Sequence, residues 1–540
     1  MSRAAKSVTA STSESLEIPP EGHRNRKYRF FEILPGALSW FILFLPLVLS
    51  FINVTAAAIF ILAYILVFFA RSIATDIRAF LGYRAMSEQM QLDWNGLLGE
   101  IDTGVVGDGD FMRPKWHLSN LERLATTKPV IKPHEILHAV IIATYNESRE
   151  VLEPTIHSVL NTDYDPKKMI FVLAYEERGG PEMEERVKAL VREYGDKFYH
   201  AMAVKHPGNI AGEVIGKGGN ITHAGRALQK YLEAEQIDPL RVIVTTLDSD
   251  NRPSKPYFAA VSYVYSVVPD PLRASYQPLA MYTNNIWDAP APMRVIATGN
   301  TFFYVVQTQR PHLERNFSAH AQSMRALIDM DFWSTRTIVE DGHQFWRSYF
   351  HFDGDYRVYP LAVPIYQDAV LAEGYVKTLK AQFVQLRRWT YGASDIAYIA
   401  DQGFMRPNKV PRGDLIGKFL RTLEGHVTWA TGAPLLLYAA FIPGLFNPQN
   451  YAANQLPGII SRIQTFGLIG LSASLFVALK TLPPRPPRYK RHRTLLMLLQ
   501  WLYLPVTTVC YGAAAALYSQ TRLMFKKYLT FIVTEKAVKS

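Results

Sequence analysis

The chain has 540 residues, too many for one ordinary domain, and its 58 Lys and Arg against 47 Asp and Glu give a formal charge of +11. Hydrophobic residues make up 49% of the chain and charged residues only 19%, a balance that indicates membrane-embedded segments. The one cysteine, Cys510, excludes an intrachain disulfide framework and a cysteine-based metal site.

Two apolar, uncharged runs near the N-terminus, 37–52 and 55–70, are separated by Asn53. Because a membrane-spanning helix needs about 20 residues, we expect a tight transmembrane hairpin within 34–70 that uses some flanking residues. A pair of buried soluble helices is the alternative, but both runs are apolar on every side. Residues 1–33 are polar and basic, and we expect a disordered tail there.

Three further apolar stretches, 427–446, 463–479 and 495–518, extend the expected transmembrane region over 426–518. The loop 483–493 is rich in Lys and Arg, as is the flank before the first apolar run. By the positive-inside rule, both basic segments and the middle of the chain are expected in the cytoplasm.

The stretch 495–518 has two interpretations. A single crossing would place the basic tail 519–540 outside, whereas a break at Pro505 would make the stretch re-entrant or interfacial. The excess of basic residues is explained by this topology and by contact with anionic membrane lipids. No basic-aromatic stripe indicates a nucleic-acid partner, so none is expected.

Between the apolar regions we expect a cytoplasmic connector (71–135), a soluble domain (136–395) and interfacial helices (396–425). In the soluble domain, predicted strands and helices alternate: strands 138–144, 168–175 and 241–247, and helices 151–160, 181–195 and 221–234. Such alternation predicts a mostly parallel α/β sheet. Ligands on these sheets bind at the carboxyl ends of the strands, so polar residues at those ends are candidates for the functional site.

The strand 241–247 ends in the sequence TTLDSDNRP, which places Asp248 and Asp250 one residue apart. Two carboxylates this close repel each other unless a cation lies between them or each has its own partner. Carboxylate oxygens are the ligands that Mg²⁺ or Mn²⁺ takes, together with water and substrate phosphates. The pattern therefore favours a divalent metal site with a nucleotide diphosphate.

Three other segments follow or adjoin the predicted strands: TYNES (144–148), YEERGG (175–180) and GEVIGKGGN (212–220). Taken singly, each is most often a turn or a helix cap. The glycine-rich segment could bring backbone N–H groups and Lys217 to an anion, although it lacks the spacing of a Walker A loop. Together, they indicate one polar sheet edge.

The segment TIVEDGHQFWR (337–347) contains the adjacent acids Glu340 and Asp341. A carboxylate here could act as a general base, and the alternative is an acidic helix N-terminus that favours the helix dipole. His343 has no partner at ligand spacing, so we interpret it as structural.

The segment QLRRW (385–389) places Gln385, Arg388 and Trp389 on one face of a predicted helix. A guanidinium suits a phosphate, and an indole suits the face of a sugar ring. The alternative is an amphipathic helix that rests on the membrane surface.

In this set and order, the motifs resemble those of the membrane-embedded processive members of glycosyltransferase family 2, which include cellulose and hyaluronan synthases. The resemblance runs from about Leu34 to Glu535. It implies a GT-A (Rossmann-like) α/β domain on the cytoplasmic side, inserted between N-terminal and C-terminal transmembrane helices.

The resemblance also implies a role for each motif. Asp341 would be the catalytic base with Glu340 beside it, and Asp248 and Asp250 would hold Mg²⁺ or Mn²⁺. The nucleotide would be bound by Tyr145, Glu147, Glu176, Lys217 and Asp248. The acceptor and the diphosphate would be contacted by Gln277, Asn300, Gln385, Arg388 and Trp389.

Two positions depart from the family pattern. The second strand ends in Tyr175-Glu176-Glu177 where an Asp pair is usual, and Val339 replaces the usual Thr before the acid pair. A glutamate still accepts a hydrogen bond from a uracil N–H, but its longer side chain changes the pocket that reads the base.

The implied activity is inverting, metal-dependent transfer from a nucleotide-sugar, expected to be a UDP-sugar, to a growing polysaccharide. The polymer would leave through the protein's own helices, and a bacterial inner membrane is the expected location. The first alternative is a non-processive transferase that acts on a lipid acceptor. The second is an inactive scaffold or transport partner, which the presence of Asp248, Asp250, Asp341 and Arg388 opposes.

Overall fold

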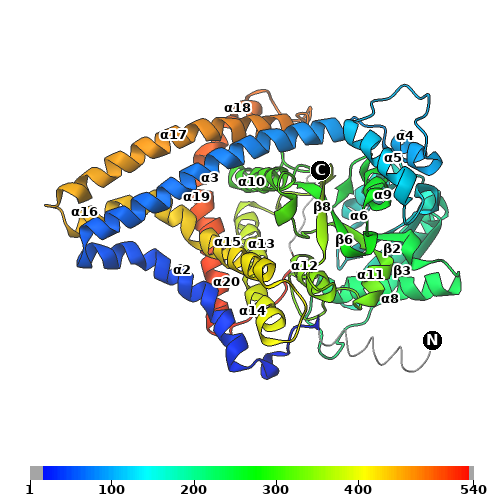
Figure 1. The fold of residues 1–540 in the computed structure, drawn as a ribbon, viewed down its shortest axis with the longest axis horizontal. Coiled ribbons are helices and arrows are strands. Elements are labelled where there is room, and N and C mark those ends of the chain that lie inside the picture. Colours follow the sequence, from blue (N-terminus) through cyan, green and yellow to red (C-terminus); the bar gives the residue numbers. More distant parts are fainter. Residues whose placement is uncertain (1–15, 534–540) are drawn as a thin grey trace.

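The computed structural model describes residues 16–533, without the side chains of 468–474, and shows an α/β domain flanked by long apolar helices (Figure 1). Helices α2 (Arg26–Ile52) and α3 (Val54–Gln89) form the predicted hairpin, and Asn53 between them caps α3 by accepting from the Ala56 N–H at 3.1 Å. Both helices are long and apolar enough to cross a membrane. The structure thus has two long apolar helices joined at Asn53, and their transmembrane position stays a prediction.

The predicted N-terminal tail is too long. Helix α2 begins at Arg26 rather than after residue 33, and the side chains of Leu16 and Ile18 are buried. Glu17 accepts hydrogen bonds from Ser334 at 2.5 Å and from Arg347 at 3.1 Å. The segment before α2 thus packs on the α/β domain, and the disorder predicted for residues 1–15 lies outside the described part.

On the C-terminal side, α15 (Arg412–Tyr438) and α16 (Ile442–Phe446) together are long and apolar enough to cross a membrane. Helix α15 is continuous through residues 425 and 426, so the expected interfacial helices and the first C-terminal apolar stretch share one helix. Helix α17 (Tyr451–Thr481) contains the predicted stretch 463–479, whose middle side chains lie outside the described part, and it packs along α3 (Figure 1).

The last apolar stretch lies in a helical run formed by α18 (His492–Leu499), α19 (Leu504–Thr507) and α20 (Ala514–Met524). Its length and composition would allow a crossing. However, Arg493 donates to the Trp287 carbonyl at 3.1 Å, and Ser519 donates to the Arg387 carbonyl at 2.6 Å. Because both ends contact the α/β-domain side, the run lies along that side, which favours the interfacial alternative.

The α/β domain is built on an eight-stranded sheet with the order β3-β2-β1-β4-β7-β6-β8-β5. The strands are β1 (Leu137–Thr144), β2 (Met169–Glu176), β3 (His200–His206), β4 (Val242–Asp248), β5 (Arg252–Pro253), β6 (Ala274–Met281), β7 (His320–Ser323) and β8 (Arg357–Tyr366). The first four strands are parallel, and the sheet becomes mixed where β7 pairs antiparallel with both β4 and β6. The expected α/β fold class between two sets of apolar helices is confirmed, although only the first half of the sheet is purely parallel.

Helices cover both faces of the parallel half, and for that reason β1 is buried along its whole length. Val140 and Ile142 pack under α6 (Arg149–Leu160), α7 (Gly180–Tyr194) and α9 (Tyr257–Val267), whereas Ala139 and Ile141 pack against α8 (Lys217–Ala234) and α11 (Met324–Asp329). The other helices of the domain are α4 (Trp94–Thr103), α5 (Lys115–Thr127), α10 (Ala291–Gln307), α12 (Glu340–His351), α13 (Tyr375–Thr390) and α14 (Asp395–Ala400).

Helix α3 connects the apolar region to the α/β domain without a break. Its C-terminal half packs on α10, where Gly82 lies so close to the Val305 carbonyl that no side chain would fit. Helix α10 faces the cavity described below, so α3 fixes the position of that cavity relative to the apolar helices.

Candidate active site

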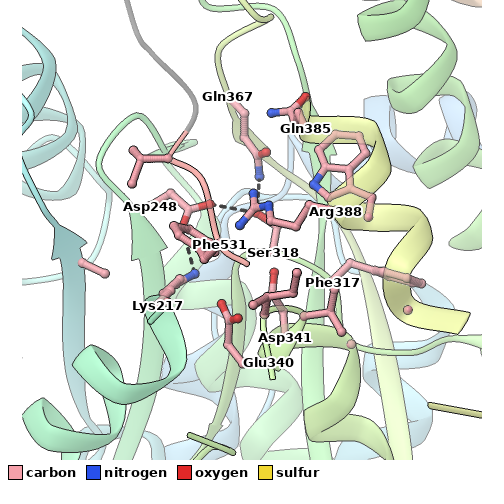
Figure 2. Close-up of a pocket in the computed structure, with 18 of the residues that line it drawn as sticks. Lys217, Asp248, Phe317, Ser318, Glu340, Asp341, Gln367, Gln385, Arg388 and Phe531 are labelled. Atoms are coloured by element: carbon pink, nitrogen blue, oxygen red, sulfur yellow. Dashed lines mark hydrogen bonds and ion pairs between the residues drawn. The ribbon is translucent and has the colours of Figure 1, made fainter. Parts of the chain in front are cut away.

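The carboxyl ends of β1, β2, β4 and β8 line one cavity of about 1040 Å³. Its remaining walls come from α10, from the N-termini of α8 and α12, from α13, and from α15. Figure 2 shows Lys217 and Asp248 on one side, Glu340 and Asp341 below them, and Arg388 reaching in from α13 opposite. Of the residues predicted from the sequence, all except Gln277 line this cavity.

The β4 exit brings Asp248 and Asp250 to the cavity, and in this structure each carboxylate has partners. Asp248 forms an ion pair with Lys217 at 2.8 Å and accepts from Ser318 at 3.4 Å. Asp250 is 8% exposed and accepts from the backbone N–H of Asp368 at 3.3 Å. Within the described residues no three His, Cys, Asp or Glu side chains form a metal cluster, so a cation here would need ligands from a substrate.

Lys217 is the first residue of α8, four residues earlier than the predicted helix start. Burial lowers the pKa of Lys217, because it disfavours the charged ammonium group. The negative charges of Asp248, and then of Asp341 and Glu340, have a larger opposite effect, so the pKa of Lys217 lies above its usual value. Gly218 makes the position possible, because a side chain there would meet the Ser334 carbonyl and the Glu340 Cβ. A buried ammonium group therefore faces both acidic sites.

Glu340 and Asp341 are the first two residues of α12, where acidic side chains interact favourably with the helix dipole. Glu340 is 1% exposed, and burial followed by the neighbouring Asp341 raises its pKa well above the usual range. One oxygen of Glu340 has no hydrogen-bond partner among the described residues. The raised pKa favours the protonated form of Glu340, and both acids line the cavity.

Helix α13 presents Gln385, Arg388 and Trp389 to the cavity on one face, as predicted. Trp389 packs against Tyr282 with ring centroids 5.9 Å apart. The Arg388 guanidinium lies over the Phe531 ring at 4.7 Å, and its Nε has no hydrogen-bond partner among the described residues. A cation held by a ring rather than by a carboxylate is available to an anionic ligand.

At the β1 exit, Glu147 shapes the loop around Tyr145. One Glu147 oxygen accepts from the Thr144 hydroxyl and the Tyr145 N–H, both at 2.7 Å. Tyr145 lies under the Arg178 guanidinium at 5.4 Å. Tyr145, Glu147 and Arg178 all line the cavity, so Glu147 orders the loop that presents the ring.

Glu176 at the β2 exit belongs to a charged network that was not predicted. Its carboxylate binds Arg178 at 2.8 Å and His206 at 3.2 Å, and His206 also binds Glu213 at 3.0 Å. Burial disfavours the charged imidazole, but the hydrogen bonds to the two glutamates outweigh it and raise the pKa of His206 to about 9.

This network predicts a pH-dependent loss of stability. Because the folded pKa of about 9 exceeds the usual 6.5, the charged His206 contributes fully below pH 6.5 and is lost as the pH rises through 9. We expect the wild type to lose on the order of 1 to 3 kcal/mol of unfolding free energy across this window, relative to His206→Gln. Thermal unfolding of both proteins from pH 6 to about 10 measures this difference, and parallel curves would contradict it.

Two predicted acceptor residues differ in their position. Gln277 is buried in β6, where its amide accepts from the Phe317 N–H at 2.9 Å and donates to the Phe317 and Ala319 carbonyls. It therefore supports the cavity wall from behind and, unlike the other predicted residues, does not line the cavity. Asn300 does line the cavity, from the middle of α10.

Several cavity residues were not predicted. Gln367 and Asp368 follow β8, and Gln367 donates to Ser318 at 3.0 Å. Phe531 comes from the segment after α20, which the sequence indicated only as a basic tail. Gln367 and Asp368 are polar residues directly after a strand, so a prediction of β8 would have indicated them. No local sequence pattern links Phe531 to Arg388.

The cavity continues away from the sheet towards α15, where Thr422, Thr428 and Trp429 line it. At this inner end Arg315 donates to Thr422 at 2.8 Å and lies over the Trp346 ring at 4.9 Å. Asp395 receives a hydrogen bond from His343 at 2.7 Å, so His343 supports a cavity residue.

No family model and no curated protein matches the chain. Among solved structures, it is similar to the mannosyltransferase PcManGT from Pyrobaculum calidifontis in complex with GDP-Man and Mn²⁺, with 15% identity over 84% of this chain and 99% of that chain and a TM-score of 0.39. It is also similar to S. aureus TarS 1–349, with 11% identity over 74% and 94% of the two chains and a TM-score of 0.35. For GalNAc-T7 with UDP, GalNAc and Mn²⁺ the identity is 12% over 54% of each chain, with a TM-score of 0.29. Likenesses this distant assign no activity, so the function is argued from the site.

Proposed function

We propose that the chain is an inverting, metal-dependent glycosyltransferase that moves a sugar from a UDP-sugar to a growing polysaccharide. The observation that carries the proposal is the single cavity that holds the β4 carboxylates, a buried lysine, the acid pair of α12 and the Arg-Trp face of α13. These groups supply the requirements of glycosyl transfer: a base, cationic partners for a diphosphate, and an aromatic surface for a sugar.

In the proposed reaction, Asp341 takes the proton from an acceptor hydroxyl. The acceptor oxygen then attacks the anomeric carbon from the face opposite the diphosphate, and the bond between that carbon and the diphosphate oxygen breaks with its electron pair. Lys217 and Arg388 stabilise the negative charge of the leaving diphosphate. Glu340, whose pKa is raised by burial and by Asp341, lies beside Asp341 and positions it as the base.

The carboxylates of Asp248 and Asp250 fit a hard divalent cation, and we propose that they hold Mg²⁺ or Mn²⁺ when the donor binds. The ion supplies charge neutralisation to the diphosphate. Among the described residues, these two carboxylates at the end of β4 would hold the ion, and Lys217, now paired with Asp248, would then pair with the diphosphate.

Continuation of the cavity onto α15 supports processive synthesis with export. Thr422, Gly425 and Thr428 line the cavity from the middle of α15, which belongs to one of the helices able to cross a membrane. The hydroxyl and aromatic groups along it suit a neutral sugar chain. The basic loops favour a cytoplasmic location for the catalytic domain, and a bacterial inner membrane is the proposed location.

A lipid acceptor is the second candidate. Trp429 lines the cavity and is 39% exposed, so the cavity wall on α15 reaches the outer surface of an apolar helix. A lipid-linked sugar could enter there without passing through the protein. This candidate would make the enzyme non-processive.

The test is a product assay on the purified chain in lipid nanodiscs with Mg²⁺ or Mn²⁺. Radiolabelled UDP-sugars and GDP-mannose are supplied singly, and the product is sized. High-molecular-weight product from one donor supports the proposal and names the sugar, whereas single addition to lipid supports the second candidate. No transfer and no nucleotide release from any donor would refute both and favour an inactive scaffold.

A further inference from the structure

Outside the cavity, four arginines converge where α3, the segment 308–315 after α10, and α15 meet. Two contacts join these three elements: Arg71 of α3 forms an ion pair with Glu424 of α15 at 2.5 Å, and Arg315 donates to Thr422 of α15 at 2.8 Å. We call the four residues the arginine patch: Arg71, Arg78, Arg310 and Arg421.

The arginine patch carries more positive charges than there are carboxylates paired with it. Within residues 16–533, Glu424 is the one carboxylate paired with it, through Arg71, and the other three arginines have no ion pair. Burial, and then the three other arginines, lower the pKa of Arg310, which shows that they lie close enough to repel its charge. Asp76 lies about 140° around α3 from Arg71 at 3.6 residues per turn, so it faces elsewhere.

Exposed apolar side chains occupy neighbouring turns of the same two helices. Ile73 and Ile77 on α3 are 49% and 58% exposed, and Ile416 and Leu420 on α15 are 47% and 55% exposed. Arg71 is also the first charged residue after the apolar run 55–70. Arginines among exposed apolar side chains at the end of an apolar run are typical of the boundary between lipid tails and headgroups.

We propose that the arginine patch binds the phosphate of an anionic phospholipid in the leaflet next to the α/β domain. A guanidinium pairs with phosphate through two parallel N–H donors, and a phosphate among the four arginines would offset their mutual repulsion. The exposed apolar side chains on neighbouring turns, and the apolar run that ends just before Arg71, favour a phosphate that carries acyl chains over a free one.

Binding of the lipid would also fix a wall of the cavity. Arg310 and Arg315 belong to one short segment, and Arg421 precedes Thr422, which Arg315 contacts inside the cavity. A phosphate that bridges Arg310 and Arg421 would hold the segment against α15. This second part rests on the proposed function, whereas lipid binding itself does not.

The binding test is native mass spectrometry of the full chain titrated with phosphatidylglycerol, with phosphatidylcholine for comparison. We expect selective retention of phosphatidylglycerol, and roughly hundredfold weaker binding in the triple variant Arg78→Gln/Arg310→Gln/Arg421→Gln. The single variant Arg421→Gln, at an exposed position, should weaken binding about fivefold if the triple variant does not fold. The control is Arg84→Gln, which removes an exposed arginine of the same helix that is already paired with Glu88. Equal retention by wild type and arginine-patch variants would overturn the proposal.

Two further measurements separate the possible outcomes. Inorganic phosphate should not displace the lipid, and displacement at equal concentration would overturn the choice of a lipid. Donor turnover in nanodiscs should rise when phosphatidylglycerol is added for the wild type and for Arg84→Gln, but not for the triple variant. Turnover that does not respond to phosphatidylglycerol would overturn the coupling to the cavity. Absence of turnover in every membrane would refute the proposed function. Lipid binding would then be decided by the mass-spectrometry result alone.

Discussion

The variant Asp341→Asn is expected to lose sugar transfer by roughly 10²–10⁴-fold while it binds the nucleotide-sugar almost as well as the wild type. Asparagine has nearly the same shape but cannot take a proton from the acceptor hydroxyl. Turnover with the donor identified by the product assay measures the loss, and titration calorimetry of the nucleotide measures the retained affinity.

The matched control for this prediction is Glu340→Gln. Glu340 is buried with a raised pKa, which favours its neutral form, and glutamine is a neutral side chain of the same size that can donate to Asp341. We expect its turnover to stay within about tenfold of the wild type. If Glu340→Gln lost as much turnover as Asp341→Asn, the base would have been assigned to the wrong carboxyl.

The second large effect is expected from Asp250→Ala. Removal of one of the two β4 carboxylates should weaken metal-dependent nucleotide binding by roughly 100-fold, because the remaining carboxylate cannot hold the ion alone. Asp250 suits the test better than Asp248, whose removal would also leave Lys217 buried without its ion-pair partner. Nucleotide affinity is measured across a Mn²⁺ titration and again with a chelator.

Asp355→Asn is the control for the loss of a carboxylate, because Asp355 is 65% exposed and pairs with Arg273 on the surface. Its nucleotide affinity should show the wild-type response to Mn²⁺. An Asp250→Ala protein with the same response would rule out a metal role for this residue.

The parallel half of the sheet could be predicted because its strands are short apolar runs bounded by polar residues. The runs at β1, β2 and β4 have this form, and their boundaries agree with the structure to within one or two residues. The sequence pattern therefore predicts that the motifs at the ends of these strands lie on one edge of the sheet.

The other half could not be predicted, for identifiable reasons. Strand β6 contains Pro278 and β8 contains Pro360 and Pro364, and proline normally argues against a central strand. The sheet accommodates them through an irregularity in the pairing register at Pro278 and Leu279. Because β6 and β8 were missed, so were the buried position of Gln277 and the cavity residues after β8.

The remaining differences arise from contacts between distant parts of the chain. Glycines in 212–220 suggested a loop, but α8 begins at Lys217 because Gly218 fits against Ser334 and the acid pair. The His206 network and the contact of Phe531 with Arg388 likewise join segments that no local pattern connects. Sequence patterns indicated which residues carry the chemistry, whereas their supporting partners required the folded chain.

Helix α3 has a mechanical consequence. It is one uninterrupted helix of 36 residues, about 54 Å long at 1.5 Å per residue. From Arg71, at the end of its apolar run, to Gly82, where it meets α10, it spans about 16 Å. A straight helix is stiff over that length. Helix α3 therefore keeps a constant distance between the end of its apolar run and the cavity. In the proposed polymer synthesis, the acceptor would therefore have to move relative to the enzyme after each addition.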